Sequence, residues 1–145
     1  MHLVAYGFSQ IYGVNYLDTY SPIAQLASIC AILAIAARNN WEIDTFDFNR
    51  AYLNGELNEG EEIYMQLPSG YQIQGENTNQ TLKLLKSLYR LKQAGWQWYE
   101  VLICALAEIG LITSSYNPGI FHTRVRDKTI VLAIHVDNCI ITGSL

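Results

Sequence analysis

The chain has 145 residues and a mass of 16.4 kDa, which is enough for one domain with its own core and too little for two. Half of the residues are hydrophobic and 15% are charged, so the composition excludes an intrinsically disordered chain. The net charge of −4 is atypical of a nucleic-acid binder. The longest apolar run, Ile29–Ala37, is too short to cross a bilayer, and no secretory signal opens the sequence.

The first predicted elements are a helix and a strand. From Ser28, a suitable N-cap, apolar residues recur with helical spacing, and Asn39-Asn40 can end the helix. Residues 41–48 then alternate apolar and polar side chains with a period of two. This alternation predicts a half-buried strand, and the helix is expected to lie on the sheet that contains it.

The middle of the chain predicts two short strands and a second helix. The strands are Glu62–Leu67 and Thr81–Leu85, separated by a turn at Pro68-Ser69-Gly70 and a polar loop over residues 71–80. The helix runs from about Gln93 to Ile109, with an apolar stripe on one face and a glycine at the C-cap position.

The last predicted unit is a β-hairpin. Thr129–Val136 and Cys139–Thr142 are rich in β-branched residues, and only Asp137 and Asn138 lie between them. Aspartate and asparagine tolerate the positive φ that a two-residue turn requires. Because strands and helices mix without regular alternation, the sequence predicts an α+β fold with a mainly antiparallel sheet packed on two amphipathic helices.

Two acids mark a candidate metal site. Asp47 ends one predicted strand and Asp137 lies at the hairpin tip, so on neighbouring strands, about 4.8 Å apart, their carboxylates can converge on Mg²⁺. On spacing alone the simpler interpretation, a solvated strand-end acid and a turn former, is favoured. The three cysteines and three histidines have no zinc-ligand spacing and no disulfide pattern.

Eight motifs in fixed order resemble the reverse transcriptase domain of copia-type retrotransposon polyproteins. Together they run through essentially the whole chain. They are Leu3-Val4-Ala5-Tyr6-Gly7-Phe8-Ser9-Gln10, Tyr20-Ser21-Pro22, Thr45-Phe46-Asp47-Phe48, Ala51-Tyr52-Leu53-Asn54-Gly55-Glu56-Leu57, Glu62-Ile63-Tyr64-Met65, Ser87-Leu88-Tyr89-Arg90-Leu91-Lys92-Gln93-Ala94, Trp98-Tyr99 and His135-Val136-Asp137-Asn138.

The resemblance implies a fingers–palm fold and template-directed DNA synthesis with two Mg²⁺ or Mn²⁺ ions. Its catalytic acids are matched by Asp47 and Asp137. The implied metal ligands are Asp47, Asp137, Asn138 and Phe48, and the implied substrate-binding residues are Tyr52, Gln93, Arg50 and Ala51. Without the resemblance, a core aromatic and a helix-start polar residue would be the preferred roles of Tyr52 and Gln93. Implied partners are primer–template, deoxynucleoside triphosphates and other polyprotein segments, with no membrane, in the cytoplasm.

Several departures from the family pattern fall on the chemistry. Asn138 stands where the family has a second hairpin aspartate, so metal binding should weaken. Basic residues of the family are replaced at His2, Tyr6, Cys30 and Trp96, which lowers the expected affinity for phosphates. Arg50 and Arg90 replace small residues that let the backbone turn tightly. A basic cluster remains that could follow a nucleic-acid backbone or form a solvated face: Lys83, Lys86, Arg90 and Lys92.

Three hypotheses follow for the chain, read as one partial reverse transcriptase domain over residues 1–145. It begins inside the first motif and ends just after the hairpin, without a thumb or RNase H segment. The first hypothesis is an RNA-directed DNA polymerase, weakened or inactive as it stands. The second is a non-catalytic retrotransposon remnant that binds nucleic acid or protein, and the third is an unrelated α+β interaction domain.

Overall fold

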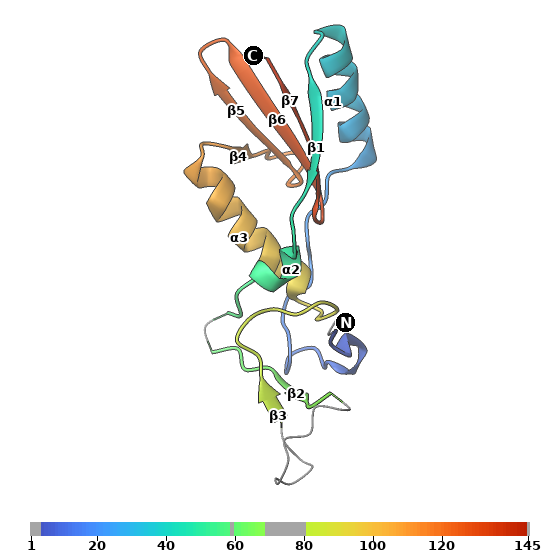
Figure 1. Ribbon diagram of the computed structural model, residues 1–145, viewed down its shortest axis with the longest axis vertical. Helices are drawn as coiled ribbons and strands as arrows, with labels where there is room; N and C mark the ends of the chain where they lie inside the picture. Colours follow the sequence, from blue (N-terminus) through green and yellow to red (C-terminus); the bar gives the residue numbers. More distant parts are fainter. Residues whose placement is uncertain (1–3, 59, 69–80, 145) are drawn as a thin grey trace.

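The computed structural model describes residues 4–58, 60–68 and 81–144. The turn predicted at residues 68–70 and the loop predicted at 71–80 therefore lie almost entirely outside the described residues, as does His2. Figure 1 shows an elongated molecule, with a large sheet and two helices at one end and a small two-stranded sheet at the other.

The large sheet is antiparallel throughout, with the strand order β1-β7-β6-β5-β4. The small sheet pairs β2 with β3, also antiparallel. Together with the helices, this confirms the predicted α+β class with a mainly antiparallel sheet. The strands are β1 (Ile43–Asp47), β2 (Tyr64–Gln66), β3 (Thr81–Lys83), β4 (Ile112–Thr113), β5 (Ile120–Val125), β6 (Lys128–His135) and β7 (Asn138–Gly143).

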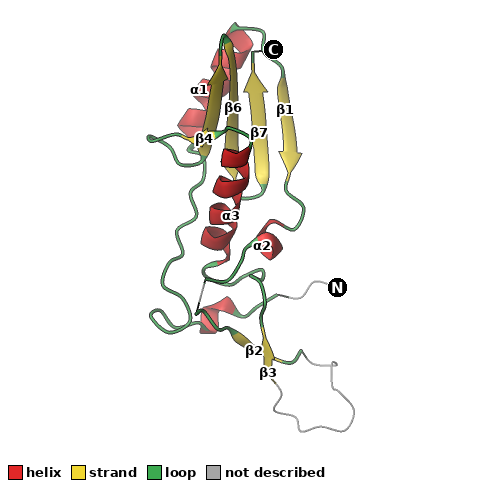
Figure 2. Ribbon diagram, turned by 90° about the vertical axis from the view of Figure 1, so that its left-hand side faces the viewer, coloured by secondary structure: helices red, strands yellow, loops and turns green. Residues whose placement is uncertain are grey.

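Two helices cover opposite faces of the large sheet. Alternate residues of β6 point to opposite sides, and Leu132 and Ile134 belong to the same buried cluster as Trp98 of α3 (Ala94–Glu108). On the other side, Ala133 belongs to a smaller cluster that contacts α1 (Leu26–Arg38), which Figure 2 shows behind the sheet. The main core therefore lies between α3 and the sheet.

Both predicted long helices form, with one changed boundary. The helix α3 lies within one residue of its predicted bounds, and Gly110 follows it at φ 83°. The N-cap of helix α1 is Gln25, three residues before the predicted N-cap Ser28, and the helix begins at Leu26. Instead, the Ser28 hydroxyl accepts a hydrogen bond from Asn117 Nδ2 at 2.8 Å, which ties the helix to the loop before β5. The elements α2 (Ala51–Asn54), the 3-10 helix η1 (Gly7–Ser9), β4 and β5 were not predicted.

The strand predicted at residues 41–48 forms, but the prediction that it is half-buried is wrong. All five residues of β1 are exposed. The physical reason is position: β1 is an edge strand that pairs with β7 alone, and the main hydrophobic cluster under α3 is built from β5, β6 and β7. Alternation in the sequence cannot distinguish an edge strand from a central one.

The predicted hairpin also forms, with its turn one residue earlier than predicted. His135 pairs with Asn138, so the two turn residues are Val136 and Asp137, and Asn138 is the first residue of β7. The positive φ of 66° falls on Val136. A β-branched residue is strained in that region of backbone conformation. The tip of this hairpin is therefore a strained turn held by the ladder on both sides.

Gly119 is predicted to be the least replaceable glycine beside the sheet. A Cβ at this position would lie 2.1 Å from the Ala24 nitrogen, where the chain crosses the end of β6. We expect Gly119→Ala to lower the free energy of unfolding by about 3 kcal/mol in urea denaturation, because overpacking forces the backbone apart. Gly110→Ala is the control, since a Cβ there meets nothing within 4 Å and costs only the left-handed conformation, about 1 kcal/mol. Equal losses for the two variants would contradict the close crossing.

Candidate active site

The end of β1 and the turn of the β6–β7 hairpin lie side by side. Asp47, the last residue of β1, pairs with Asn138, the first residue of β7. One residue further, the Phe48 N–H donates a hydrogen bond to the Asp137 carbonyl oxygen at 2.9 Å. Segments about ninety residues apart in the sequence thus bring the two predicted acids to the same end of the sheet.

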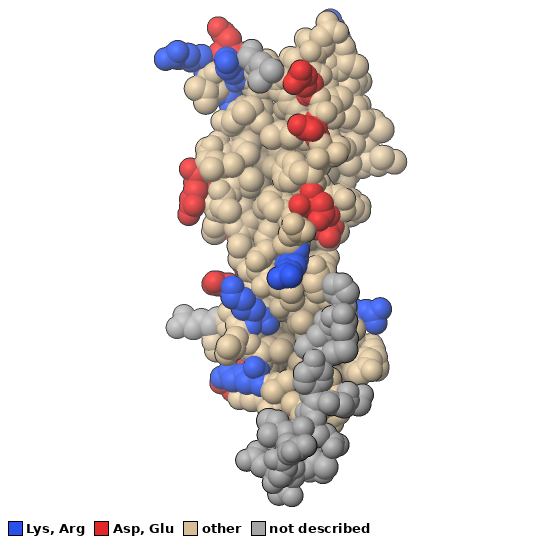
Figure 3. Space-filling model, viewed as in Figure 1, with Lys and Arg blue, Asp and Glu red and all other residues tan. Residues whose placement is uncertain are grey.

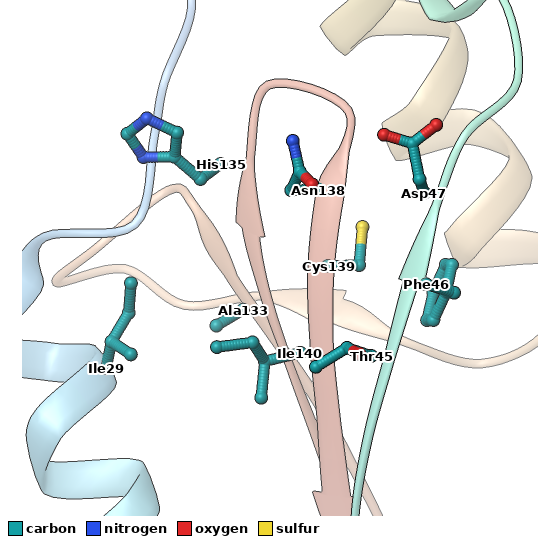
Figure 4. Close-up of a pocket in the computed structure, with 9 residues that line it drawn as sticks. All are labelled: Ile29, Thr45, Phe46, Asp47, Ala133, His135, Asn138, Cys139 and Ile140. Atoms are coloured by element: carbon teal, nitrogen blue, oxygen red, sulfur yellow. The ribbon is translucent and has the colours of Figure 1, made fainter.

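A groove of about 510 Å³ opens along this part of the sheet, on the face that α1 covers. Figure 4 shows the polar ends of Asp47, Asn138 and His135 at one end of the groove. Apolar side chains, among them Ile29 and Ile140, line its other end. The groove therefore has a polar mouth beside the hairpin turn and an apolar floor.

The negative charges of both acids act on one buried thiol. Burial, followed by the charges of Asp47 and Asp137, raises the pKa of Cys139 to about 12. One carboxylate oxygen of Asp137 accepts a hydrogen bond from Asn138 Nδ2 at 2.9 Å. Within the residues that the structure describes, neither acid forms an ion pair. The site thus concentrates negative charge that a cation could neutralise.

The donor set at this end of the sheet fits a magnesium-type ion in part. Carboxylate and amide oxygens are the ligands such ions prefer, and substrate phosphates commonly complete the coordination. The candidates are Asp47, Asp137 and the Asn138 amide, which carries no charge. In residues 4–58, 60–68 and 81–144, no three carboxylate, imidazole or thiol groups gather to hold a metal.

The short helix α2 places three of the expected substrate residues next to the hairpin. Arg50 precedes it in a left-handed conformation, with φ 58°, and Ala51 is fully buried. The Tyr52 ring packs edge-on against Tyr89, with centroids 5.2 Å apart. Burial, followed by the charge of Asp137, raises the pKa of the Tyr52 hydroxyl, so this ring lies close to the candidate metal site.

Gln93 is bound within the protein. It is 2% exposed, and its Nε2 donates to the Asn15 carbonyl oxygen at 3.0 Å and to a Glu61 carboxylate oxygen. Its Oε1 accepts a hydrogen bond from Gln10 Nε2 at 3.0 Å. The residues of this network other than Gln93 were not predicted, because they lie 32 to 83 positions from it and no local pattern marks such contacts.

The expected basic cluster is not uniform. Figure 3 shows Lys and Arg side chains over the half of the molecule that holds α2, β2 and β3. Lys83 is ion-paired with Glu62 and lies 6.0 Å from the centre of the Tyr64 ring. The backbone of Arg90 has φ 70°, a left-handed conformation that glycine adopts more easily than a residue with a Cβ. The family has a small residue at this position. Because Glu62 neutralises part of its charge, Lys83 is expected to attract a nucleic-acid phosphate more weakly than an unpaired lysine would.

The three thiols are expected to differ in reactivity. Cys30 and Cys104 are exposed, whereas Cys139 is buried. With its pKa raised to about 12, only about one Cys139 side chain in 10⁴ is a thiolate at pH 8, and the thiolate is the reactive form. Titration with a chromogenic disulfide at pH 8 should therefore count two rapid thiols, and the third after unfolding in urea. Three rapid thiols in the folded chain would contradict the buried position of Cys139.

Comparisons with known proteins identify the family of the chain. Residues 1–145 match the family described as reverse transcriptase (RNA-dependent DNA polymerase). A retrovirus-related Pol polyprotein from the Arabidopsis thaliana transposon RE1 is 35% identical over 142 residues, which are 98% of this chain and 10% of the relative. The corresponding polyprotein from the Nicotiana tabacum transposon TNT 1-94 is 34% identical over 142 residues, 97% of this chain and 10% of the relative.

The similarity extends to a yeast relative but not to a solved structure. The Ty1-H Gag-Pol polyprotein of Saccharomyces cerevisiae is 34% identical over 94 residues, 61% of this chain and 5% of the relative. No solved structure matches the chain. The chain spans about one tenth of the length of its plant relatives. Its described helices include none that is both long and apolar enough for a membrane span.

Proposed function

Because the chain belongs to the reverse transcriptase family, as a reverse transcriptase domain of copia-type retrotransposon polyproteins, we propose that it is built for RNA-directed DNA synthesis at the β6–β7 hairpin. The observation that carries the proposal is the antiparallel pairing of Asp47 with Asn138, directly beside Asp137. The large sheet with α1 and α3 would form the palm. The small sheet and the N-terminal segment would form the fingers.

The proposed centre would hold Mg²⁺ or Mn²⁺ through the oxygens of Asp47, Asp137 and Asn138, with Phe48 beside them. Bound there, such ions would neutralise phosphate charge and lower the barrier for attack by a primer hydroxyl. The protein's part is to place two carboxylates beside one strained turn. Because the Asn138 amide brings no charge, the affinity for the ions is weaker than with a third carboxylate.

The residues around α2 would bind the nucleotide. The Tyr52 ring, supported by Tyr89, lies close to Asp137, where it can exclude a ribose 2′-hydroxyl. Arg50 and Ala51 would lie against the triphosphate, and because Ala51 is fully buried, its contact requires that the side chains covering it move aside. The Phe48 N–H already donates to Asp137, and the Gln93 amide already has protein partners. Contact of Gln93 with a nucleotide therefore requires that at least one of those hydrogen bonds opens.

Primer extension on a primed RNA template with Mg²⁺ tests this proposal. The chain is compared with Asn138→Asp and Asp137→Ala, after circular dichroism has shown that all three are folded. Extension by the chain or by Asn138→Asp, absent from Asp137→Ala, supports a polymerase centre at the hairpin. Absence of extension from all three folded proteins would refute catalysis by this chain.

The second candidate function is a non-catalytic remnant of such a polymerase. Asn138 favours it, because the missing carboxylate lies at the centre of the site. The positive φ of Arg50 and Arg90 favours it too. The backbone is strained at both positions, because each has a side chain where the family has a small residue. In either case the proposed partners are primer–template, deoxynucleoside triphosphates if active, and other polyprotein segments, in the cytoplasm.

Binding of nucleic acid should depend on the loop that carries Lys86 and Lys92. We expect the double variant Lys86→Ala/Lys92→Ala to bind a fluorescent primer–template more weakly, with a salt slope smaller by about 0.9 for each phosphate that the variant no longer neutralises. Anisotropy titrations at several salt concentrations measure both quantities. The control, Arg124→Ala/Lys128→Ala, makes the same charge change at the far end of the large sheet. Equal weakening by both pairs would show that only net charge matters.

A further inference from the structure

The carboxylate of Glu61, in the loop before β2, binds two buried amides of α3. Gln93 is the N-cap residue of this helix and Gln97 lies one turn later, and the two residues are 2% and 1% exposed. Gln93 Nε2 donates to Oε1 of Glu61, and Gln97 Nε2 donates to Oε2 at 2.8 Å. The Asn58 backbone N–H donates to the same Oε2 at 3.2 Å. Glu61 has no ion pair in the part of the chain that the structure describes, so N–H groups and not a cation hold its charge there.

An ionised carboxylate only accepts hydrogen bonds, so Glu61 determines which way both amides point. Each glutamine turns its NH2 group toward Glu61 and its carbonyl oxygen away. The consequence is visible at Gln97, whose Oε1 is buried and has no hydrogen-bond partner among the described residues. The reverse orientation would place this oxygen against a carboxylate, and two acceptors without a proton between them repel each other. Glu61 therefore fixes the orientation of the amides even where one of them loses a partner.

The two ends of the Gln93 amide are held unequally. Its Nε2 donates to two acceptors, Glu61 and the Asn15 carbonyl oxygen, the latter at 3.0 Å. Its Oε1 accepts from a neutral group, Gln10 Nε2, at 3.0 Å. Hydrogen bonds to an ionised group are about twice as strong as those between neutral groups, so the bond to Gln10 is the one that opens most easily. A ligand that takes the place of Gln10 must bring a donor of its own.

We propose that Glu61 is a positioning residue for nucleotide binding: it keeps the Gln93 NH2 group in place and leaves Gln93 Oε1 as the atom that a nucleotide contacts. The inference rests on the proposed function, in which Gln93 meets the nucleotide. The nucleotide replaces Gln10 and offers a hydroxyl or N–H hydrogen to Gln93 Oε1. Gln10 stays anchored during this exchange, because its own Oε1 accepts from the Lys92 backbone N–H at 2.7 Å.

Two ligands with three phosphates each test this role. Deoxythymidine triphosphate has a sugar hydroxyl and a base N–H, whereas inorganic tripolyphosphate has neither. NMR titrations with Mg²⁺ present measure the dissociation constants of both ligands. We expect Glu61→Gln to weaken binding of the nucleotide about fivefold, because the new amide has one acceptor oxygen and can orient only one of the two glutamines. Binding of tripolyphosphate should not change, because it offers no donor to Gln93.

Matched variants separate this role from a general effect of charge. Glu62→Gln makes the same charge change at the neighbouring carboxylate, which is paired with Lys83, and should bind both ligands as the unaltered chain does. Gln10→Ala removes the competing donor and should tighten binding of the nucleotide about twofold. The hydrogens of the Gln93 NH2 group should exchange with water about tenfold faster in Glu61→Gln and at an unchanged rate in Glu62→Gln.

The outcomes distinguish this inference from the proposed function. Nucleotide binding that is unchanged in Glu61→Gln, or that weakens there as much as tripolyphosphate binding, would overturn the positioning role and leave the nucleotide site in place. Unchanged exchange of the Gln93 hydrogens in Glu61→Gln, or weaker nucleotide binding by Gln10→Ala, would also overturn it. Failure of the unaltered chain to bind either ligand would overturn the nucleotide site itself, and with it this role of Glu61.

Discussion

Asn138→Asp is expected to bind Mn²⁺ at least tenfold more tightly than the unaltered chain. The substitution places a third carboxylate opposite Asp47 in the antiparallel pair. It also removes the amide N–H that now occupies one carboxylate oxygen of Asp137. A tenfold change in affinity is about 1.4 kcal/mol, which is modest beside the attraction between a divalent ion and an added charge at a shared site. Calorimetric titration with Mn²⁺ measures the change.

The same substitution should have a cost in the absence of metal. Three carboxylates at one turn repel one another, so we expect the metal-free variant to be less stable by about 1 kcal/mol and to regain that stability as Mn²⁺ is added. Gln66→Glu is the control, since it makes the same change from amide to acid on the small sheet. If Gln66→Glu tightened Mn²⁺ binding as much, the hairpin would not be the metal site.

The sequence predicted the elements whose signal is local. The helix α3 has a long apolar stripe and a glycine just past its end, and its observed bounds lie within one residue of the predicted ones. The strands β6 and β7 are dense in β-branched residues, and their hairpin was expected. The strand β5 (Ile120–Val125) also contains β-branched and aromatic residues, and Asp127, one of the two residues between it and β6, is a turn-forming residue. That signal could have identified it.

What the sequence could not predict depends on pairing across the chain. The register of β6 against β7 is set by the whole ladder, from Ile130 opposite Gly143 to His135 opposite Asn138, and this ladder moves the positive φ from the expected Asp–Asn pair to Val136. The exposure of β1 depends on its place at the sheet edge.

The hydrogen bonds of Gln93 also depend on contacts between distant parts of the chain, so the sequence could not predict them. Its partners come from the N-terminal segment and from the loop before β2, brought together only in the folded chain. The motif that contains Gln93 predicted a nucleotide contact. In the structure, protein groups already hydrogen-bond to the same amide. Whether Gln93 is free to contact a nucleotide therefore depends on the fold and not on the motif alone.

Asp47→Ala is expected to abolish metal-dependent primer extension, by about 10³-fold or more in the Asn138→Asp background, where activity should be easiest to measure. The same change should leave the free energy of unfolding within about 0.5 kcal/mol. Asp47 is exposed at the end of an edge strand, and its carboxylate has no hydrogen bond or ion pair with the described residues, so its removal takes away little that holds the fold.

Asp44→Ala completes this comparison on the same strand. Asp44 pairs with Ile141, and its side chain points to the opposite face of the sheet from that of Asp47, so the charge change is the same and the groove is untouched. Extension should survive Asp44→Ala. Loss of extension in both variants would indicate a general effect of charge on nucleic-acid binding. Survival in Asp47→Ala would remove Asp47 from the catalytic role, because no neighbouring side chain on β1 can bring a carboxylate to the same end of the groove.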